Sequence, residues 1–402
     1  MDNAAIAALG EKYVMRTYGR YPFALIRGEG ARVWDADGRE YLDFVSGLAV
    51  NALGHSHPQV VAAIREQAGK LLHCSNLYWI EPQVELAQLL VENSALDKVF
   101  FCNSGAEANE AAIKLARKYA KEHRGPESYA IITMRRSFHG RTLATLTATG
   151  QEKFHRGFAP LPAGFKYVPF NDLSSLRAAV GPQTAAIMLE PVQGEGGVYA
   201  ANKDYLQAVR DLCDDEGLLL IFDEVQCGLG RTGYLFAYQY YEVEPDILTL
   251  AKALAGGVPI GAMLAKEKIA AAFAPGDHAS TFGGNPLATA AGVAAFKALM
   301  AEGLAEKARV LGAYFHRELE KLVREFPQLI EVRGRGLLLG VEIDGPADAV
   351  VAACQERGLL INSLHGHVLR LLPPLIVEQE DIDRAMAIFK EALQEVLAGG
   401  NN

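Results

Sequence analysis

Short apolar runs alternate with helix-like segments between about positions 95 and 265, and this alternation constrains the fold more than any other feature of the chain. Helical patterns at 106–120 and 204–216 separate several of the runs. Apolar strands that alternate with helices predict a mostly parallel sheet with both faces covered. The strand-like runs are 99–101, 129–133, 185–189, 218–222 and 247–250.

Polar residues follow three of these runs at the point where each run ends. Glu190 and Asp223 each follow one run directly, and a loop containing Lys252 follows the last. Ligands of parallel α/β sheets bind beyond the carboxyl ends of the strands. We therefore expect these three residues to lie near one another at a binding site.

Lys252 stands at the end of an apolar stretch and before a glycine-rich bend, and the next charged residue is Lys266. Apolar surroundings lower the pKa of a lysine, so its free amine becomes available as a nucleophile for a Schiff base. A Schiff-base lysine with an acidic partner for a pyridinium nitrogen, here Asp223, is the arrangement that pyridoxal phosphate requires. A surface lysine is the alternative, and the lack of charged neighbours disfavours it.

The chain has 402 residues, which exceeds the length at which single cores stop growing, so two domains are expected. We expect an N-terminal segment that packs with the small domain, a large cofactor-binding domain, and a small C-terminal α/β domain. Their predicted ranges are 1–50, 51–292 and 293–402. The patterns behind this division are a hairpin at 31–42 with an Asp-Gly turn, helix from 293 to 325 interrupted near Gly303 and Gly312, two strands with a glycine turn at 329–342, and a final helix near 381–397.

Charge and composition exclude several classes of function. The net charge is −9 and long basic runs are missing, which argues against a nucleic-acid or anionic-membrane partner. Five cysteines without a C-x-x-C pair indicate neither a disulfide framework nor a zinc site, and fit a reducing compartment. No targeting segment or apolar window of about 20 residues is recognisable, so we expect a cytoplasmic protein.

Three loops carry further candidate residues. Ser104 stands between a strand and a helix start, where backbone amides and its hydroxyl would bind a phosphate, although an ordinary helix cap completed by Glu107 explains the same residues. Phe138 can stack on a flat ring and Arg141 can bind a carboxylate, or both can belong to an ordinary surface loop. Glu195, in a glycine loop, is a candidate salt-bridge partner.

Two other patterns suggest sites that we do not expect. The run 228–233 matches G-x-G-x-x-G, but Asp223 and Glu224 stand between it and the strand, where a dinucleotide pyrophosphate would be repelled. We expect a bent, closely packed loop there. His55 and His57 lack a carboxylate or cysteine at ligand spacing, so no metal site is expected.

Together, the segments resemble the class III pyridoxal-phosphate aminotransferases of fold type I, and among them the acetylornithine aminotransferases. The resemblance covers nearly the whole chain, and the six segments in this order are highly specific. They are VNALGHSHP at 50–58, NSGAEA at 103–108, SFHGRT at 137–142, FDEVQ at 222–226, LAKA at 250–253 and STFGGNPL at 280–287.

The resemblance implies a fold with a large, mostly parallel seven-stranded sheet and a smaller α/β domain. It also implies pyridoxal 5'-phosphate, attached at the catalytic Lys252, which then moves protons. Asp223 would pair with the pyridinium nitrogen, Phe138 would stack on the ring, and Gln226 would contact the ring oxygen. The full set of implied cofactor-binding residues is Ser104, Gly105, Ala106, Phe138, Asp223, Glu224, Val225, Gln226, Lys252 and Thr281.

The implied substrate-binding residues are Arg141, Ser280, Glu195, Arg370 and Tyr18. Arg141 would hold the α-carboxylate of the amino donor, with Ser280 nearby. Arg370 would hold the α-carboxylate of glutamate, and Glu195 would neutralise it while the first substrate is bound. Thr281 would complete the phosphate site of a neighbouring subunit, so the resemblance implies an obligate homodimer with shared sites.

The implied reaction is ping-pong transfer of the terminal amino group of N-acetylornithine to 2-oxoglutarate, a step of arginine synthesis. Succinylornithine, ornithine or 4-aminobutyrate are alternative donors, and a same-fold aminomutase or a non-catalytic binding protein are alternatives of other kinds. The small side chains of Gly47 and Ala49 favour an acylated donor, because ornithine enzymes tend to carry an aromatic residue there.

Overall fold

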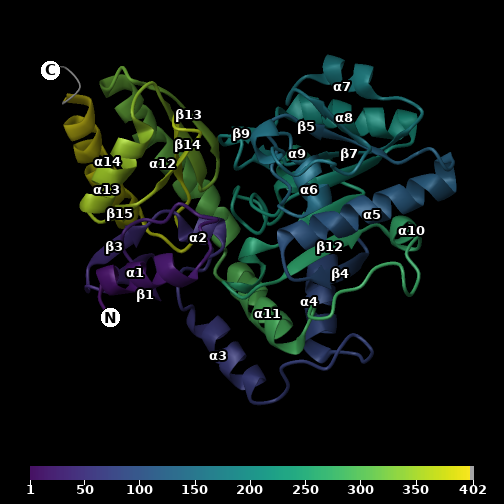
Figure 1. The fold of residues 1–402 in the computed structure, drawn as a ribbon, viewed down its shortest axis with the longest axis horizontal. Helices are drawn as coiled ribbons and strands as arrows, with labels where there is room; N and C mark the ends of the chain where they lie inside the picture. The colour runs from purple at the N-terminus through teal and green to yellow at the C-terminus, as the bar shows by residue number, and fades with distance from the viewer. Residues whose placement is uncertain (399–402) are drawn as a thin grey trace.

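A seven-stranded sheet lies at the centre of the larger part of the molecule in the computed structural model, which describes residues 1–398 (Figure 1). The strands are mutually parallel except for β12, which is antiparallel to both of its neighbours. This confirms the predicted mostly parallel sheet. In spatial order the strands are β4 (Lys98–Cys102), β12 (Gly261–Ala265), β11 (Ile247–Leu250), β10 (Leu219–Asp223), β7 (Thr184–Leu189), β5 (Ala130–Met134) and β6 (Phe165–Val168).

Both faces of this sheet are buried, which is why its strands read as continuous apolar runs rather than as alternating patterns. In β10, Leu219 and Ile221 pack into the cluster on the α5 face, whereas Leu220 and Phe222 pack into the larger cluster on the opposite face. Helix α5 (Gly105–Arg124) covers the first face with a row of alanines that allows close approach to the sheet.

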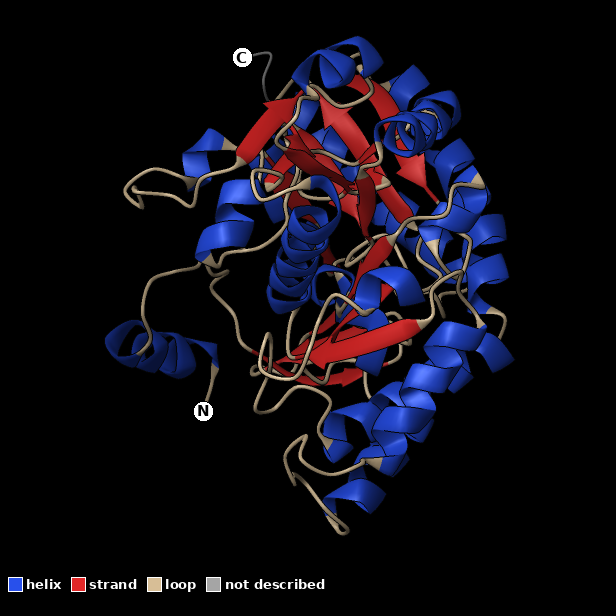
Figure 2. Ribbon diagram, turned by 90° about the vertical axis from the view of Figure 1, so that its right-hand side faces the viewer, coloured by secondary structure: helices blue, strands red, loops and turns tan. Residues whose placement is uncertain are grey.

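The helices of the larger part surround the sheet (Figure 2). The long helix α11 packs against both α3 and α4. The helical segments are α3 (Pro58–Ala68), α4 (Glu81–Glu92), α6 (Leu143–Ala148), η1 (Glu152–Phe154), α7 (Leu173–Ala179), α8 (Lys203–Glu216), α9 (Ala237–Tyr241), η2 (Lys252–Ala255), α10 (Glu267–Ala270) and α11 (Pro286–Ala301), and a short ribbon joins β8 (Val192–Gln193) to β9 (Tyr199–Ala200).

The smaller part contains a four-stranded antiparallel sheet (Figure 1). Two of its three helices pack against this sheet, and the third packs against those two helices. The predicted pair of strands at 329–342 and the predicted final helix are confirmed. In spatial order the strands are β13 (Leu329–Arg335), β14 (Leu338–Ile343), β17 (Val368–Leu371) and β16 (Asn362–Leu364), and the helices are α12 (Leu304–Glu325), α13 (Ala347–Glu356) and α14 (Gln379–Ala398).

The N-terminal strands join a strand from the far end of the chain. The predicted hairpin is present, with Gly38 at φ 88° in its turn, and β3 pairs in parallel with β15 (Leu359–Leu360). Helix α1 (Asn3–Tyr13) has no buried residue and projects from the body of the molecule (Figure 2). The remaining elements are β1 (Leu25–Glu29), β2 (Arg32–Asp35), β3 (Glu40–Asp43) and the short turn α2 (Ser46–Ala49).

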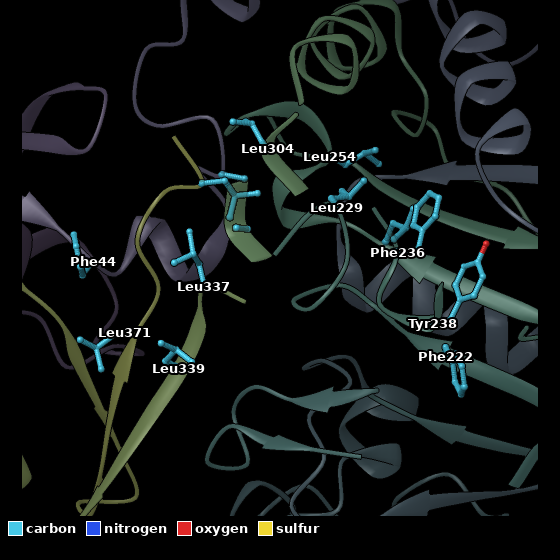
Figure 3. Close-up of a cluster of buried hydrophobic side chains, with 14 of the residues drawn as sticks. Phe44, Phe222, Leu229, Phe236, Tyr238, Leu254, Leu304, Leu337, Leu339 and Leu371 are labelled. Carbon is cyan, nitrogen blue, oxygen red and sulfur yellow. The ribbon is translucent and has the colours of Figure 1, made fainter. Parts of the chain in front are cut away.

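One apolar cluster runs from the large sheet into the smaller part (Figure 3). Phe222 of β10 belongs to it, as do Leu339 of β14, Leu371 of β17 and Phe44 from the N-terminal region. Burial of a large aliphatic or aromatic side chain stabilises a protein by about 1.5–3 kcal/mol, so this cluster holds the two parts together. The predicted domain boundary at 292 falls inside α11, and the three-part division stays a prediction.

One detail differs from the expectations. The predicted helix at 293–325 breaks at Gly303, with φ 61°, as expected, but Gly312 lies inside α12 and does not interrupt it. A Cβ on Gly312 would stand 2.3 Å from the carbonyl oxygen of Gly336, so this glycine allows the two segments to pack closely.

Among residues 1–398 no single helix is long and apolar enough to cross a membrane, although the bent pair α11 and α12 passes on length and composition alone.

Candidate functional site

A cavity of about 440 Å³ opens at the carboxyl ends of β7, β10 and β11, as the sequence predicts for a parallel sheet. Its walls come from loops that follow several strands and from the start of α5. The lining residues include Ser104, Gly105, Ala106, Asn109, Phe138, His139, Arg141, Glu190, Glu195, Asp223, Val225, Gln226, Lys252 and, on the side of α2, Val50.

Lys252 faces this cavity from the first residue of η2. Its backbone has φ 44°, an unfavourable conformation for a residue with a side chain, and its amine makes no hydrogen bond or ion pair within residues 1–398. Burial lowers the pKa of the amine, and the carboxylates of Glu195 and Asp223 oppose this shift only in part. The structure therefore presents a desolvated amine, the form in which lysine is a nucleophile.

Asp223, the last residue of β10, is buried and fully hydrogen-bonded. Its Oδ1 accepts from the backbone N–H of Val225 at 3.0 Å, and its Oδ2 accepts from Asn109 Nδ2 at 2.7 Å. His139 Nδ1 lies 2.8 Å from the same Oδ2. Thr249 Oγ1 donates to Asn109 Oδ1 at 2.7 Å, which fixes the orientation of the asparagine amide. These contacts hold the carboxylate of Asp223 in one orientation beside the cavity.

The start of α5 forms another wall of the cavity. Ser104 is the N-cap of the helix, and its Oγ accepts from the N–H of Glu107 at 3.2 Å. Glu107 accepts from the N–H of Asn103 at 2.6 Å, so the predicted cap is present and lies beside the cavity. A Cβ on Gly105 would stand 2.7 Å from Val225, so only glycine allows this approach. The helix terminus leaves backbone amides available to an anion.

Glu190 connects two loops of the site. One carboxylate oxygen accepts from the N–H of Phe138 at 2.9 Å, and the other accepts from the N–H of Gly194 at 3.2 Å. Burial and the neighbouring Asp223 hold the pKa of Glu190 well above its usual value. Glu190 thus ties the loop of Phe138 to the loop of Glu195.

Arg370 projects from β17 of the smaller part and is 1% exposed. Its Nη1 donates to Glu195 Oε1 at 2.6 Å and to Gln226 Oε1 at 3.2 Å, and its Nε donates to Asn362 Oδ1 at 3.2 Å. Burial alone would raise the pKa of Glu195, but the charges of Arg370 and Lys252 lower that pKa to about 2. The buried guanidinium is therefore neutralised by an ionised carboxylate.

Five predicted site residues are not among those that line the cavity, and one of them is Arg370, which reaches the lining residues Glu195 and Gln226. Glu224 is buried with its carboxylate turned to the start of α9, where it accepts from the N–H groups of Ala237 at 2.6 Å and Tyr238 at 2.7 Å. Ser280 accepts from Asn103 Nδ2 at 3.0 Å, and Thr281 beside it is exposed. Tyr18 is 74% exposed, away from the cavity in this single chain.

The two rejected patterns have structural roles. The 228–233 segment is a closely packed loop, as expected, in which the buried Arg231 donates to the carbonyls of Leu337, at 3.0 Å, and Pro373. His55 pairs with Asp43 and His57 with Glu302. No group of three or more metal-ligating side chains is found within residues 1–398.

Sequence reasoning missed Asn109, Asn362 and Gly257 to Ile260 as parts of the site or its support. For Asn109 a signal was present: it is a short polar side chain among alanines in a helix whose face is otherwise apolar. For Asn362 no local signal exists, because its role depends on the pairing of β16 with β17, which places it opposite Arg370.

The cavity fits pyridoxal phosphate. It combines a half-buried amine with no hydrogen-bond partner among residues 1–398, a buried carboxylate held in place by Asn109, an aromatic ring at Phe138, and a helix N-terminus approached closely at Gly105. The amine would bind the aldehyde carbon of the cofactor, and the carboxylate would bind its ring nitrogen. The phenylalanine ring would cover the face of the cofactor ring, and the helix N-terminus would bind the phosphate.

Comparisons with known proteins agree with this geometry. The family described as aminotransferase class III matches residues 13–393. The acetylornithine aminotransferase of Caldanaerobacter subterraneus subsp. tengcongensis is 57% identical over 387 residues, covering 96% of this chain and 98% of the relative. That of Methanocaldococcus jannaschii is 55% identical over 390 residues, covering 96% and 98%. The crystal structure of ornithine aminotransferase from Toxoplasma gondii superposes with a TM-score of 0.96 at 37% identity, covering 99% of this chain and 96% of that one.

Proposed function

Because this chain belongs to the class III aminotransferase family, a pyridoxal-phosphate-dependent family, we propose that it transfers the terminal amino group of N2-acetyl-L-ornithine to 2-oxoglutarate. The products would be N-acetyl-L-glutamate 5-semialdehyde and L-glutamate, formed by a ping-pong mechanism. The observation that carries the proposal is the match over nearly the whole chain to acetylornithine aminotransferases at 57% and 55% identity.

The cofactor, when bound, supplies a carbonyl carbon for the amino group and an electron-withdrawing ring. The residues of the chain do the remaining work. Lys252 would hold the cofactor covalently, and its Nζ would take the proton from the terminal carbon of the donor and return it in the second half of the reaction. Asp223, held by Asn109 and His139, would keep the ring nitrogen protonated.

Two arginines would bind the carboxylates of the substrates. Arg141, at the rim of the cavity, would hold the α-carboxylate of the acylated donor and so leave the far end of the donor to reach Lys252. Arg370 would hold the α-carboxylate of glutamate once Glu195 moves away. While Glu195 stays paired with Arg370, a second carboxylate has no cation to bind there.

The donor is tested by comparing N2-acetyl-L-ornithine, N2-succinyl-L-ornithine, L-ornithine and 4-aminobutyrate, each with 2-oxoglutarate. We expect the highest kcat/KM for the acetylated donor; a higher value for free ornithine would replace the proposed donor.

The cofactor assignment is tested with Lys252→Ala. This variant should lose turnover and the visible absorbance of the covalently bound cofactor. Lys252→Arg is the matched control, because it keeps a positive charge but offers no amine for the covalent bond; it should fail in the same way. A variant without Lys252 that keeps both signals would refute the role of this lysine.

We also propose that the protein forms a homodimer with shared active sites, and that it is cytoplasmic. Large apolar side chains are exposed near Ser280 and Thr281, among them Phe282 at 62%, and on the segment before α4, where Leu77 is 84% and Trp79 92% exposed. A surface of this kind marks an interface. All five cysteines are free, which fits a reducing compartment.

Mixing Lys252→Ala with an inactive Thr281→Glu variant should restore activity in mixed dimers only if Thr281 acts across the interface.

A further inference from the structure

Arg141 is held by aromatic rings rather than by polar partners. Its Cζ lies 4.0 Å from the ring centroid of Phe154 and 5.5 Å from that of Phe138. The guanidinium is exposed and takes part in no hydrogen bond or ion pair within residues 1–398. All of its N–H groups therefore remain available to a ligand.

Phe154 is the last residue of η1 and does not line the cavity. Its ring is half-buried and stands at 81° to the ring of Phe138, with 6.0 Å between the centroids. The ring of Phe154 therefore contacts both the arginine at the rim and the aromatic residue that faces the cofactor site.

A stacked ring is well suited to hold an arginine that must bind a carboxylate. The attraction between a cation and an aromatic face uses none of the N–H donors, which lie in the plane of the guanidinium. A free arginine side chain would lose about 2 kcal/mol of rotamer entropy on binding, and a stacked one has already lost part of it. The ring thus raises affinity by preorganisation.

We propose that Phe154 is a positioning residue for donor recognition: its ring holds the guanidinium of Arg141 in the orientation that binds the α-carboxylate of the amino-acid donor. The proposal rests on the proposed function, in which Arg141 binds that carboxylate. It predicts that the identity of residue 154 sets the affinity for donors with an α-carboxylate, and leaves donors without one unaffected.

The test compares two donors in the first half-reaction, measured by stopped-flow spectroscopy of the holoenzyme. N2-acetyl-L-ornithine carries the α-carboxylate, and N-acetylputrescine is the same molecule without it. Phe154→Leu keeps apolar volume but removes the aromatic face, so we expect its kcat/KM for acetylornithine to fall about 3- to 30-fold, the range of a single cation–π contact. Its kcat/KM for N-acetylputrescine should stay within about 2-fold, and Phe154→Tyr should restore the wild-type ratio.

Binding without reaction gives a second measurement. N2-acetyl-L-norvaline has the α-carboxylate and the acetyl group but no terminal amine, and its Kd can be determined by calorimetry. Phe154→Leu should weaken its binding by a similar factor in the wild-type background, and should have no further effect in an Arg141→Ala background. Phe158→Leu is the matched control, at a phenylalanine that is 56% exposed and stacks on no ring or cation of the described residues 1–398.

The outcomes separate the two proposals. A wild-type enzyme that does not distinguish acetylornithine from N-acetylputrescine would overturn the proposed donor, and the role of Phe154 with it. A wild-type enzyme that does distinguish them, with an unchanged ratio in Phe154→Leu, would overturn only the positioning role. Equal losses on both donors would assign Phe154 to general stability of the site instead.

Discussion

Arg141 and Arg370 are both candidates for binding substrate carboxylates, but their surroundings are opposite. Arg141 is exposed, lies on a loop of the larger part, and is held by the rings of Phe138 and Phe154. Arg370 is 1% exposed, lies in a central strand of the smaller sheet, and is bound by three polar side chains, one of them the carboxylate of Glu195.

Under the proposed roles of the two arginines, this difference would let one site bind two substrates in turn. An arginine held only by aromatic faces is always ready for a carboxylate, because no internal anion competes with the ligand. An arginine paired with an internal carboxylate must lose that partner first, since a buried charge without a partner is costly. The acylated donor, with one carboxylate at the far end from its amine, matches the first site, and glutamate matches the second.

The largest effect is expected for Arg370→Ala. Truncating a buried, hydrogen-bonded charge costs about 2–5 kcal/mol, so the glutamate half-reaction should slow by about 30- to 5,000-fold. The acetylornithine half-reaction should change much less. Single-turnover spectroscopy of each half-reaction measures the two effects separately, with Arg370→Lys as the control that keeps the charge but not the two-pronged geometry. Equal losses in both half-reactions would remove the distinction between the two arginines.

A smaller effect is expected for Arg141→Ala. Hydrogen bonds to a charged group contribute about 1.5–3 kcal/mol each, and exposure to solvent weakens them, so kcat/KM for acetylornithine should fall about 10- to 100-fold. N-acetylputrescine, which has no carboxylate, should be used as well as before. If the reaction of N-acetylputrescine fell by the same factor, Arg141 would not be a carboxylate-binding residue.

The smallest effect is expected for Glu195→Gln, measured as stability. Removing one partner of a fully buried pair costs about 3–5 kcal/mol, and since Glu195 is partly exposed we expect about 1–3 kcal/mol in the free energy of unfolding at neutral pH.

The stability difference between the wild type and Glu195→Gln should depend on pH in a defined direction. The pKa of Glu195 is lowered to about 2 in the folded protein, below the value of about 4.3 in an unfolded chain. The pair therefore stabilises the wild type fully above about pH 4.3, and this contribution is lost as the pH falls toward about 2. Urea unfolding of both proteins between pH 3 and 7 tests this, and a stability difference that grew on acidification would contradict the pairing.

Much of the fold could be predicted because its signals are local. The apolar runs that became β5, β7, β10 and β11 are uninterrupted, and the helix starts at Ser104 and near Asp204 carry clear caps or amphipathic patterns. The strands β6 and β12 were not predicted, since Phe165–Val168 is short and partly exposed and Gly261–Ala265 consists mostly of small residues. Their positions depend on neighbouring strands rather than on their own sequence.

The functional site also contains residues that the sequence could place and residues that it could not. Lys252 and Asp223 could be placed from the sequence, because each follows an apolar strand that ends at the same edge of the sheet. The partners of the site residues could not be placed: Asn109 reaches Asp223 from the helix α5, and Phe154 reaches Arg141 from the short helix η1. Glu224 illustrates the limit, since it directly follows Asp223 but its carboxylate points toward α9 instead of the cavity.

The sequence by itself determined the chemistry of this protein: a lysine without charged neighbours, an acidic residue at a strand end, and two arginines far apart in the chain. Only the tertiary structure decided how differently the two arginines are held. Contacts such as Arg370 with Glu195, or Arg141 with the ring of Phe154, depend on how loops and strands from separate parts of the chain pack together. Residue type fixes what a side chain can do, whereas its neighbours in space fix its charge partners, its solvation and its orientation.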